Sequence, residues 1–256
     1  MIKSRYNTVE SLKIMGDASK DFLGPNINIL LWNVFKCKKT GWLEDFITLT
    51  ENKDLVLLQE AVVNSPFDNH FNLSKQHQWI MARSFRDIQT NIETGVKTGS
   101  TVATQDHYCS ASKHAEPISN TKKMLLKTVY PLCQLGQDNC ERSLLVVNTH
   151  LINFVSFEKF KDHLDQIFKT LANHKGPMLL AGDFNTWNRK RLKYFKSLAL
   201  SFSLTEVKMI RQPKVGHLLQ HLDHIYYRGI EITNVQVHTD INTSDHYPIS
   251  LSVRID

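Results

Sequence analysis

One stretch of the chain combines residue types that could carry out chemistry, Met178 to Trp187 with the sequence MLLAGDFNTW. Its apolar run is typical of a strand buried on both faces, and it ends in a glycine, a carboxylate and a carboxamide. Asp183 and Asn185 are two positions apart, so on an extended chain they project to the same side. Burying both groups is costly unless each has a partner, which a metal ion, a nucleophilic water or a phosphate would supply. Gly-Asp and Asn-Thr are also ordinary turn residues, so this stretch alone leaves a simple turn open.

Other apolar runs of the chain end in polar groups of the same kind. These groups are Asn33 in ILLWN, Glu60 in LVLLQE, His150 in LLVVNTH, Asp223 in LDHI, and Asp245 and His246 in SDHYP. Strands that repeatedly end in such groups indicate one cluster at one edge of packed sheets. Cleavage of a phosphodiester needs neutralised phosphoryl charge, an aligned water and a stabilised leaving oxygen. Carboxylates, imidazoles and a divalent cation held by carboxylates can meet these needs.

The ordered set of motifs WN, QE, NTHL, GDFN, LDHI and SDHYP resembles the endonuclease/exonuclease/phosphatase superfamily, which has the deoxyribonuclease-I-like fold. The resemblance spans residues 29 to 255, nearly the whole chain. The sequence around GDFNTW and LDHI is most similar to a small bacterial branch of that superfamily with no stated substrate. The resemblance implies a four-layer α/β sandwich, in which two mixed β-sheets pack together and helices cover their outer faces.

The resemblance also implies a metal site. Glu60 and Asp245 match the family's QE and SDH motifs and are the expected ligands of Mg²⁺ or Mn²⁺, with Asn33 helping to order the site. A hard divalent cation of this kind takes one or two carboxylates and keeps several waters. The competing interpretation of Glu60 is a surface residue after a strand.

The remaining motif residues are expected to handle protons and the phosphate. Asp183 would orient or deprotonate the attacking water, and Asn185 would hold that water or a phosphoryl oxygen. His150 and His246 would donate hydrogen bonds to the phosphate, and one of them could assist the leaving group. In the family, the residue that matches Asp223 orients the one that matches His246. The sequence shows no partner for His150, and His224 is left out because the family more often has an aromatic residue there.

Charge favours a polyanionic substrate, because the formal net charge is +6 and the sequence pI is about 9.0. Two basic runs follow expected strand ends and would rim the site if both strands end there. The candidate substrate-binding residues in them are Lys36, Lys38, Arg189 and Lys190, next to Lys39 and Arg191. The alternative is that both runs are solvated faces of a helix or a loop.

These features predict a metal-dependent phosphoesterase that hydrolyses phosphodiester bonds, with nucleic acid as the favoured substrate and partner. A phosphodiesterase or phosphatase acting on a phospholipid or an inositol phosphate is the first alternative, and a non-catalytic binding module with the same fold is the second. The sequence contains neither the Gly-x-Ser-x-Gly elbow of a serine hydrolase nor the His-Glu-x-x-His motif of a zinc hydrolase.

At 256 residues, the chain suits an N-terminal arm over 1–26 and a single domain over 27–256. No apolar run approaches membrane-spanning length, and no secretory signal is visible, so we expect a cytoplasmic protein, or an exported one if a leader has been removed. Cys37, Cys109, Cys133 and Cys140 form no C-x-x-C pair, which argues against structural zinc. Free thiols are expected, or a Cys133–Cys140 bridge in an exported protein.

Strands dominate the chain, with helices between some of them, which predicts an α/β fold with mixed sheets. A helix is expected over 41–53, and a short one within 9–15. A third helix is expected to begin after an N-cap at Ser156 and to end at Gly176-Pro177, and a fourth to begin after an N-cap at Asn188. Strands are expected to end at Asn33, Glu60, His150 and Asp183 and to cover 95–104 and 124–132, with a hairpin loop over 134–142.

Overall fold

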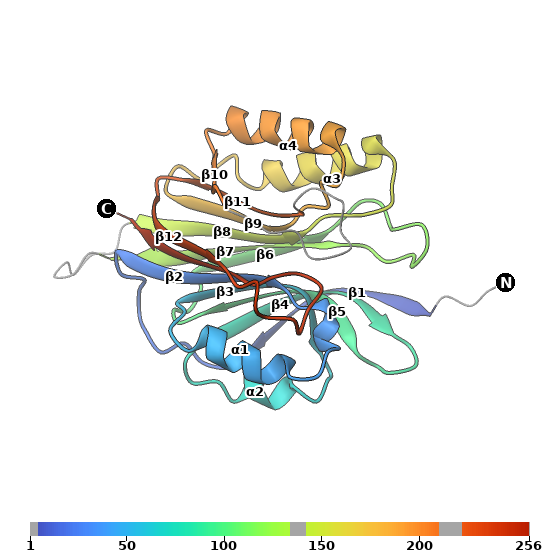
Figure 1. The fold of residues 1–256 in the computed structure, drawn as a ribbon, viewed down its shortest axis with the longest axis horizontal. Coiled ribbons are helices and arrows are strands. Elements are labelled where there is room, and N and C mark those ends of the chain that lie inside the picture. The colour runs from blue at the N-terminus through green and yellow to red at the C-terminus, as the bar shows by residue number, and fades with distance from the viewer. Residues whose placement is uncertain (1–4, 134–141, 210–221, 256) are drawn as a thin grey trace.

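The computed structural model describes residues 5–133, 142–209 and 222–255. In this part of the chain, two mixed β-sheets pack face to face, and α-helices cover both outer faces (Figure 1). The seven-stranded sheet has the order β1 (Tyr6–Met15), β4 (Gln78–Asp87), β5 (Glu93–Ser100), β3 (Leu55–Val63), β2 (Asn26–Asn33), β13 (Ile249–Arg254) and β12 (Glu231–Val237). The six-stranded sheet has the order β10 (Thr205–Glu206), β11 (Asp223–Arg228), β9 (Met178–Asp183), β8 (Arg142–His150), β7 (Met124–Leu132) and β6 (Asp106–Ala111).

The helices complete a four-layer sandwich, as the sequence predicts. Figure 1 shows α3 (Phe157–Lys169) and α4 (Arg189–Ser201) over the six-stranded sheet, and α1 (Trp42–Thr50) and α2 (Asp68–Asn72) over the seven-stranded sheet. A short 3₁₀ turn, η1 (Phe35–Cys37), follows β2. Two strand pairs in the described residues are parallel, β2 with β3 and β8 with β9. Parallel neighbours need a crossover, which α1 and α3 provide, and their carboxyl ends meet at the same edge.

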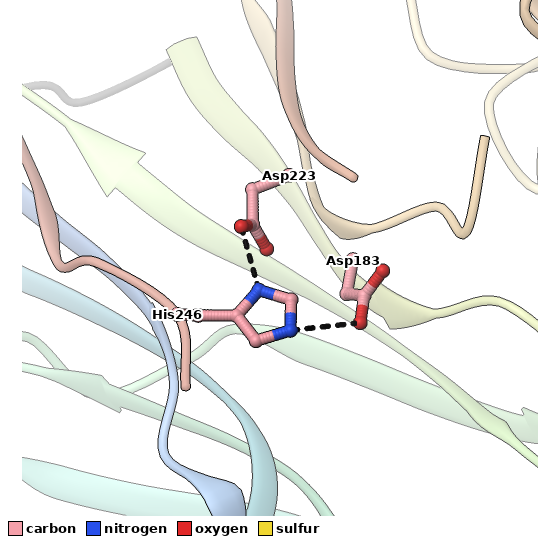
Figure 2. A group of neighbouring side chains, drawn as sticks. All are labelled: Asp183, Asp223 and His246. Atoms are coloured by element: carbon pink, nitrogen blue, oxygen red, sulfur yellow. Dashed lines mark hydrogen bonds and ion pairs between the residues drawn. The ribbon is translucent and has the colours of Figure 1, made fainter. Parts of the chain in front are cut away.

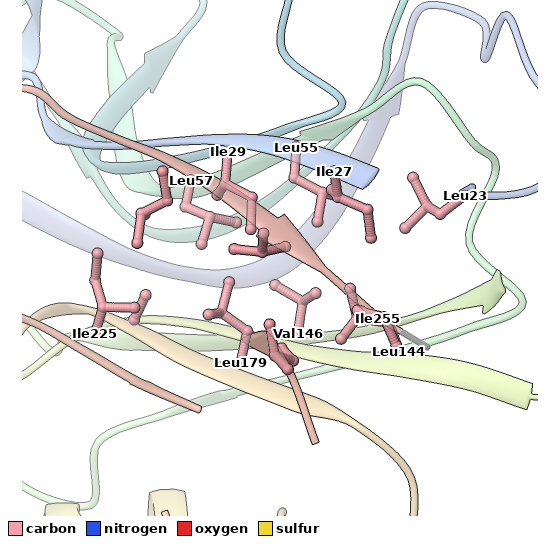
Figure 3. Packing of buried hydrophobic residues seen from close by; sticks show 14 of the residues in the cluster. Leu23, Ile27, Ile29, Leu55, Leu57, Leu144, Val146, Leu179, Ile225 and Ile255 are labelled. Atoms are coloured by element: carbon pink, nitrogen blue, oxygen red, sulfur yellow. The ribbon is translucent and has the colours of Figure 1, made fainter. Parts of the chain in front are cut away.

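The apolar runs lack polar alternation because both faces of the central strands are buried. Ile29, Leu57 and Leu179 belong to the core between the sheets, which Figure 3 shows. Leu58 faces the layer of α1 instead, and Leu180 faces the layer of α3 and α4. Strands buried on both faces read as continuous hydrophobic runs, and this is the pattern that identified them in the sequence.

The three longer helices lie where the sequence predicts them. Ser156 caps α3 by accepting a hydrogen bond from the backbone N–H of Lys159 at 3.5 Å. Asn188 caps α4 in the same way, with 2.9 Å between its Oδ1 and the backbone nitrogen of Arg191. Side-chain oxygens at these positions satisfy N–H groups that have no partner within the helix.

The short helix expected within residues 9–15 is wrong, because these residues lie in β1. This strand pairs antiparallel with β4 over most of its length, and its side chains are largely half-buried or exposed. The segment contains the apolar residues Val9, Leu12, Ile14 and Met15, but the edge of β4 gives its backbone hydrogen-bond partners as a strand. Part of the expected N-terminal arm is therefore an edge strand of the seven-stranded sheet.

Two further expectations concern cysteines and membranes. Cys37 and Cys109 are free thiols, but Cys133 is disulfide-bonded, so the expectation of free thiols does not hold for it. Cys140 and the expected loop over 134–142, up to residue 141, lie outside the described residues, and Arg142 begins β8. None of the helices in the described ranges is long and apolar enough to cross a membrane.

Candidate active site

The strand ends meet because of their register. In the parallel pair of β8 and β9, His150 lies opposite Asp183, and in the parallel pair of β2 and β3, Asn33 lies opposite Gln59. Asp223, at the start of the antiparallel strand β11, also lies opposite Asp183. The two sheets pack with these ends at one edge, so functional groups from both sheets converge there.

Gly182 allows β9 to approach β8 closely just before the site. A Cβ atom at this position would lie 1.8 Å from the backbone oxygen of Thr149, far inside contact distance. Its φ of +152° is also a backbone conformation that other residues rarely adopt. Glycine here lets Asp183 and His150, the next residues on the two strands, lie side by side.

The carboxylate of Asp183 is the centre of the cluster. Its Oδ2 accepts a hydrogen bond from Asn33 Nδ2 at 3.1 Å and lies 3.4 Å from His150 Nε2 and 3.8 Å from His246 Nε2. Its Oδ1 accepts one from the backbone N–H of Asn185 at 3.0 Å. The residue is 3% exposed, and burial raises the pKa of this carboxyl to about 6, with His246 acting in the opposite direction.

His246 lies between two carboxylates, as Figure 2 shows. Its Nδ1 is 2.7 Å from Asp223 Oδ2, and its Nε2 faces Asp183. Burial lowers the pKa of this imidazole, but the nearby negative charges, Asp223 first, outweigh burial and raise the pKa to about 10. At neutral pH the metal-free ring is therefore an imidazolium, a hydrogen-bond donor through both nitrogens.

The second histidine of the cluster, His150, differs in charge. Burial lowers its pKa well below 6.5, and the charges of Lys123, His246 and Lys36 act in the same direction. Its ring is therefore neutral at neutral pH, and the partner that the sequence does not reveal is Asp183. One carboxylate thus lies between a neutral imidazole and a charged one.

Asn185 is held in a left-handed conformation, with φ of +48°. Its side-chain Nδ2 donates to the backbone oxygen of Leu151 at 2.8 Å, and its own backbone oxygen accepts a hydrogen bond from Arg191 at 3.0 Å. These bonds tie the turn after β9 to the segment after His150, so the GDFN turn and the NTHL strand end form one unit.

The expected metal ligands lie on the other sheet. Glu60 was expected to end its strand, but β3 continues to Val63. It sits at a β-bulge between Leu58 and Ala61 with φ of +51°, and its Oε2 is 3.8 Å from Lys36 Nζ. A bulge re-aims a side chain, and the Glu60 carboxylate here lies beside Lys36, which follows Asn33 along the chain.

The loop that carries Asp245 is fastened to the end of β2. The hydroxyl of Ser244 donates to the backbone oxygen of Asn33 at 2.6 Å, and it lies 3.3 Å from Asp245 Oδ1. The backbone N–H of His246 donates to the same hydroxyl at 3.3 Å. Ser244 therefore sets the position of both Asp245 and His246 relative to Asn33.

A different group has the closest metal-ligand geometry. One ligand atom each from Asp183, Asp223 and His246 lie within 4.8 Å of one another. Carboxylate oxygens suit Mg²⁺ or Mn²⁺. Asp245 lies outside this group but close enough to His246 to raise the pKa of that imidazole, and Glu60 is also outside it. The oxygen-rich donor set fits a hard divalent cation. An imidazole must be neutral to bind a metal, so the raised pKa of His246 favours the carboxylates as ligands.

The basic residues differ in their surroundings. Lys38, Arg189 and Lys190 are exposed, and Lys190 Nζ lies 4.0 Å from the centre of the Phe157 ring. Lys36 is instead half-buried beside Glu60. Thus only part of the expected rim is open to a substrate.

Arg191 is not a rim residue, because it is 1% exposed. Its guanidinium lies 4.6 Å from the ring centre of Phe160 and 4.7 Å from that of Trp187, and burial lowers its pKa to about 10. Its hydrogen bond to the backbone oxygen of Asn185 makes it a support of the GDFN turn.

One cation near the cluster gives no signal in the sequence. Lys123, just before β7, acts on the pKa of both His150 and Asp183 and lies 3.6 Å from Glu116. It belongs to no recognisable motif, and only the fold brings it within electrostatic range of the site.

Comparison with known proteins identifies the family. Residues 30–246 match the family described as Endonuclease/Exonuclease/phosphatase family. A UPF0294 protein of Yersinia pseudotuberculosis is 31% identical over 225 residues, which cover 87% of this chain and 82% of that protein.

Two solved structures share the deoxyribonuclease-I-like fold of this chain. The endonuclease/exonuclease/phosphatase from Beutenbergia cavernae is similar with a TM-score of 0.69 and 15% identity, covering 90% of this chain and 72% of the other. The human Nocturnin catalytic domain with bound sulfate anion has a TM-score of 0.64 and 16% identity, covering 91% of this chain and 94% of the other. The match to the family model covers more than half of the sequence, so the chain belongs to the endonuclease/exonuclease/phosphatase family.

Proposed function

We propose that this protein is a divalent-metal-dependent phosphodiesterase that acts on nucleic acid. The observation that carries the proposal is the convergence of Asn33, His150 and His246 on one buried carboxylate, Asp183. Asp223 lies behind His246 and fixes its ring. This arrangement contains a proton acceptor, a charged donor and a neutral imidazole within one cluster, as cleavage of a phosphodiester by water requires.

The residues of the cluster divide the work of an in-line attack. Asp183, ionised above about pH 6, accepts a proton from the attacking water and orients it. His246, held by Asp223 as an imidazolium, donates a hydrogen bond to a phosphoryl oxygen as charge develops there. Asn185 and His150 fix the position of the phosphate. Glu60 and Asp245 would hold a divalent cation, which would supply positive charge to neutralise the phosphoryl group.

Nucleic acid is the favoured substrate because of charge. The net charge of +6 is accompanied by exposed basic residues, Lys38, Arg189 and Lys190, within a few positions of Asn33 and Asn185. A polynucleotide carries phosphates on both sides of the scissile one, so cations around the site would bind it. The bound sulfate of the Nocturnin structure is a tetrahedral oxyanion like phosphate, which supports a phosphoester but no particular one.

A lipid phosphodiester is the second candidate, because of one apolar residue near the site. Phe154, four residues after His150, is 68% exposed and has φ of +52°. Asn153 connects it to the site, since its Oδ1 accepts hydrogen bonds from both the Phe154 backbone and Trp187. An exposed phenylalanine beside a reaction centre could contact an acyl chain or a membrane surface.

A substrate screen tests the proposal. The purified protein is incubated with DNA, abasic DNA, RNA, sphingomyelin vesicles and inositol phosphates, each with Mg²⁺, Mn²⁺ or EDTA. We expect hydrolysis of a polynucleotide with Mg²⁺ or Mn²⁺ and none with EDTA. Hydrolysis of sphingomyelin alone would favour the lipid, and hydrolysis that persists in EDTA would reject the metal. Binding of a polynucleotide without turnover under every condition would favour a binding module.

A further inference from the structure

A buried chain of polar groups lies directly behind the site. Thr186 Oγ1 is 2.6 Å from His224 Nε2, and His224 Nδ1 is 2.8 Å from Glu206 Oε1. The other carboxylate oxygen of Glu206 lies 3.2 Å from Lys196 Nζ. A hydroxyl, an imidazole and a carboxylate are thus joined in a line that runs from the turn after β9, through β11, to β10.

This line of groups is closed to solvent at Thr186 and His224, whereas the Glu206 side chain is 30% exposed. Thr186 is 0% exposed and His224 is 3% exposed. The ring of His224 packs edge-on against Phe184 and against Phe195 of α4. The same order of groups activates the serine of a hydrolase, but this hydroxyl cannot be reached by a substrate. Burying such groups is costly unless each has its partner, so their role must lie in what they hold in place.

Two members of this line of polar groups adjoin residues of the site. Thr186 directly follows Asn185, and His224 directly follows Asp223 and lies opposite Gly182 in the β9–β11 register. Successive residues of a strand point to opposite faces of the sheet. While Asp223 reaches His246 on the site face, His224 therefore fastens the same strand from the helix face.

The turn that Thr186 belongs to needs such fastening. The left-handed conformation of Asn185 is strained for a residue with a side chain, and strained conformations persist only where the surroundings over-determine them. Asp183 holds the backbone nitrogen of Asn185, and Arg191 holds its backbone oxygen. The bond from Thr186 to His224 restrains the residue after Asn185, so three separate contacts hold the turn.

We propose that His224, oriented by Glu206, is a positioning residue that fixes Thr186 and so keeps Asn185 and Asp223 in register for phosphodiester cleavage. The inference rests on the proposed function of the site. It assigns a role to three side chains that do not touch the substrate, and it places them on the face of the sheet opposite the reaction. The sequence gives little hint of this, because Thr186 and Glu206 lie outside the motif residues.

Two replacements of Thr186 test the proposal. Thr186→Val keeps the shape and removes the hydroxyl, whereas Thr186→Ser keeps the hydroxyl. With bis-p-nitrophenyl phosphate and Mn²⁺, we expect Thr186→Val to lower kcat about tenfold with KM within about twofold, since positioning acts on the transition state. Thr186→Ser should stay within about threefold of the wild type, because one buried methyl group matters less than the bond.

Thr50→Val is the matched control, because Thr50 also has a buried hydroxyl, bonded to the backbone oxygen of Phe46 in α1 at 2.7 Å. It should leave kcat unchanged. Glu206→Gln keeps the shape of the carboxylate and should lower kcat less than Thr186→Val does. If Thr186→Val fails to fold, Glu206→Gln decides the question alone. Wild-type kcat in both Thr186→Val and Glu206→Gln, or an equal loss in Thr50→Val, overturns the proposal.

A second measurement does not depend on activity. Hydrogen exchange at the backbone amide of Asn185, which is bonded to Asp183, should be faster in Thr186→Val than in the wild type and unchanged in Thr186→Ser. If the wild-type protein hydrolyses no phosphodiester, the proposed function fails, but this comparison still tests the positioning. Equal exchange rates in the wild type and Thr186→Val would show that the bond does not hold the turn.

Discussion

The two sheets each supply one half of the candidate site, and the halves are built differently. From the six-stranded sheet come His150, Asp183 and Asp223, all at strand ends, with Asn185 in the turn that follows. These groups are mostly buried, and burial together with nearby charges shifts the pKa values of His150 and Asp183. From the seven-stranded sheet come Asn33, the bulge that carries Glu60, and the loop between β12 and β13 with Asp245 and His246.

The half on the seven-stranded sheet is more open and has an unusual backbone. Phe35, Lys36 and Cys37 all have positive φ, between +48° and +57°, and Glu60 has φ of +51°. Left-handed conformations cost free energy for residues with a side chain, so a run of them beside a site indicates that the backbone is shaped for function. The Glu60 side chain is 18% exposed, whereas that of Asp183 is 4% exposed.

We propose that the groups of the site have two different tasks. Proton transfer needs fixed charge states, which burial and nearby charges provide at Asp183, His150 and His246. A divalent cation keeps several waters, which suits the partly exposed Glu60. Replacing the proton-handling groups should therefore affect turnover, and replacing the expected metal ligands should affect the demand for metal.

The largest effect is expected for the proton-handling groups, Asp183 of the six-stranded half and His246, which reaches it from the seven-stranded half. Asp183→Asn and His246→Ala should each lower kcat by about a hundredfold or more with much smaller changes in KM, because both groups are proposed to act on the transition state. Steady-state kinetics on the substrate found by the screen measure this. Asp21→Asn, which changes an exposed carboxylate, is the control and should have wild-type kinetics. Wild-type turnover in either site variant would leave that residue with a structural role only.

The next prediction concerns the connection between the halves. The amide of Asn148 on β8 accepts a hydrogen bond from Gln59 at 2.7 Å and donates to the backbone oxygens of Leu58 and Lys97 across the core. Asn148→Leu keeps the branched shape of the side chain but leaves these buried groups without their partner. The free energy of unfolding in urea should fall by about 1–3 kcal/mol.

The matched control for Asn148 is Asn242→Leu, because Asn242 is exposed and its side chain bonds only locally, to Asp240. It should change the free energy of unfolding by no more than about 0.5 kcal/mol. If Asn148→Leu is as stable as the control, the polar bridge does not join the sheets energetically. The bulge at Glu60 must then be held by the strand pairing alone.

A smaller effect is expected at the proposed metal ligand Glu60. Glu60→Gln should leave the fold intact and raise the Mg²⁺ concentration for half-maximal activity by about tenfold, since one anionic ligand is lost. Lys36→Met should lower this Mg²⁺ concentration. The ammonium group of Lys36 lies 3.8 Å from Glu60 and would compete with the cation for its carboxylate. Titration of activity with Mg²⁺ measures both, and Glu44→Gln, an exposed residue of α1, is the control. Full activity of Glu60→Gln at low Mg²⁺ would contradict the assignment of Glu60 as a metal ligand.

Much of the fold can be predicted from the sequence because the strands are buried on both faces. Runs such as the one ending at Asp183 have no polar alternation, and parallel register brings their carboxyl ends to one edge. The expected convergence of His150 and Asp183 follows from this geometry. The edge strand β1 could not be predicted in the same way, because its conformation depends on pairing with β4, far along the chain.

The details of the site depend on contacts that the local sequence does not contain. Glu60 was expected to end its strand, but the bulge that re-aims it forms only against β5. Arg191 reads as part of a basic run, and its burial follows from where α4 packs. The bonds that join Thr186, His224 and Glu206 link three segments of the six-stranded side, so no single motif contains them.

The smallest effect is expected around the site rather than in either half. Replacing Lys38, Arg189 and Lys190 together by Ala removes exposed charges near Asn33 and Asn185, and Lys36 is left in place because it pairs with Glu60. On a polynucleotide, kcat/KM should fall several-fold, with the largest loss at low salt, because these charges would meet phosphates that flank the scissile one. The slope of log kcat/KM against log salt concentration should also flatten, by up to about one for each phosphate that the variant no longer neutralises.

Turnover of bis-p-nitrophenyl phosphate separates the rim from the chemistry, because this small diester has no flanking phosphates and should be cleaved as by the wild type. The control variant replaces Lys75, Lys169 and Lys175, exposed residues at the opposite ends of the strands and helices that lead to the site. It removes the same charge, so an equal loss there would mean that net charge alone attracts the substrate. If both substrates suffer equally in the rim variant, these residues support the fold or touch the reacting phosphate. If neither substrate is affected, the rim is a solvated face, and the exposed Phe154 makes a lipid phosphodiester the better candidate.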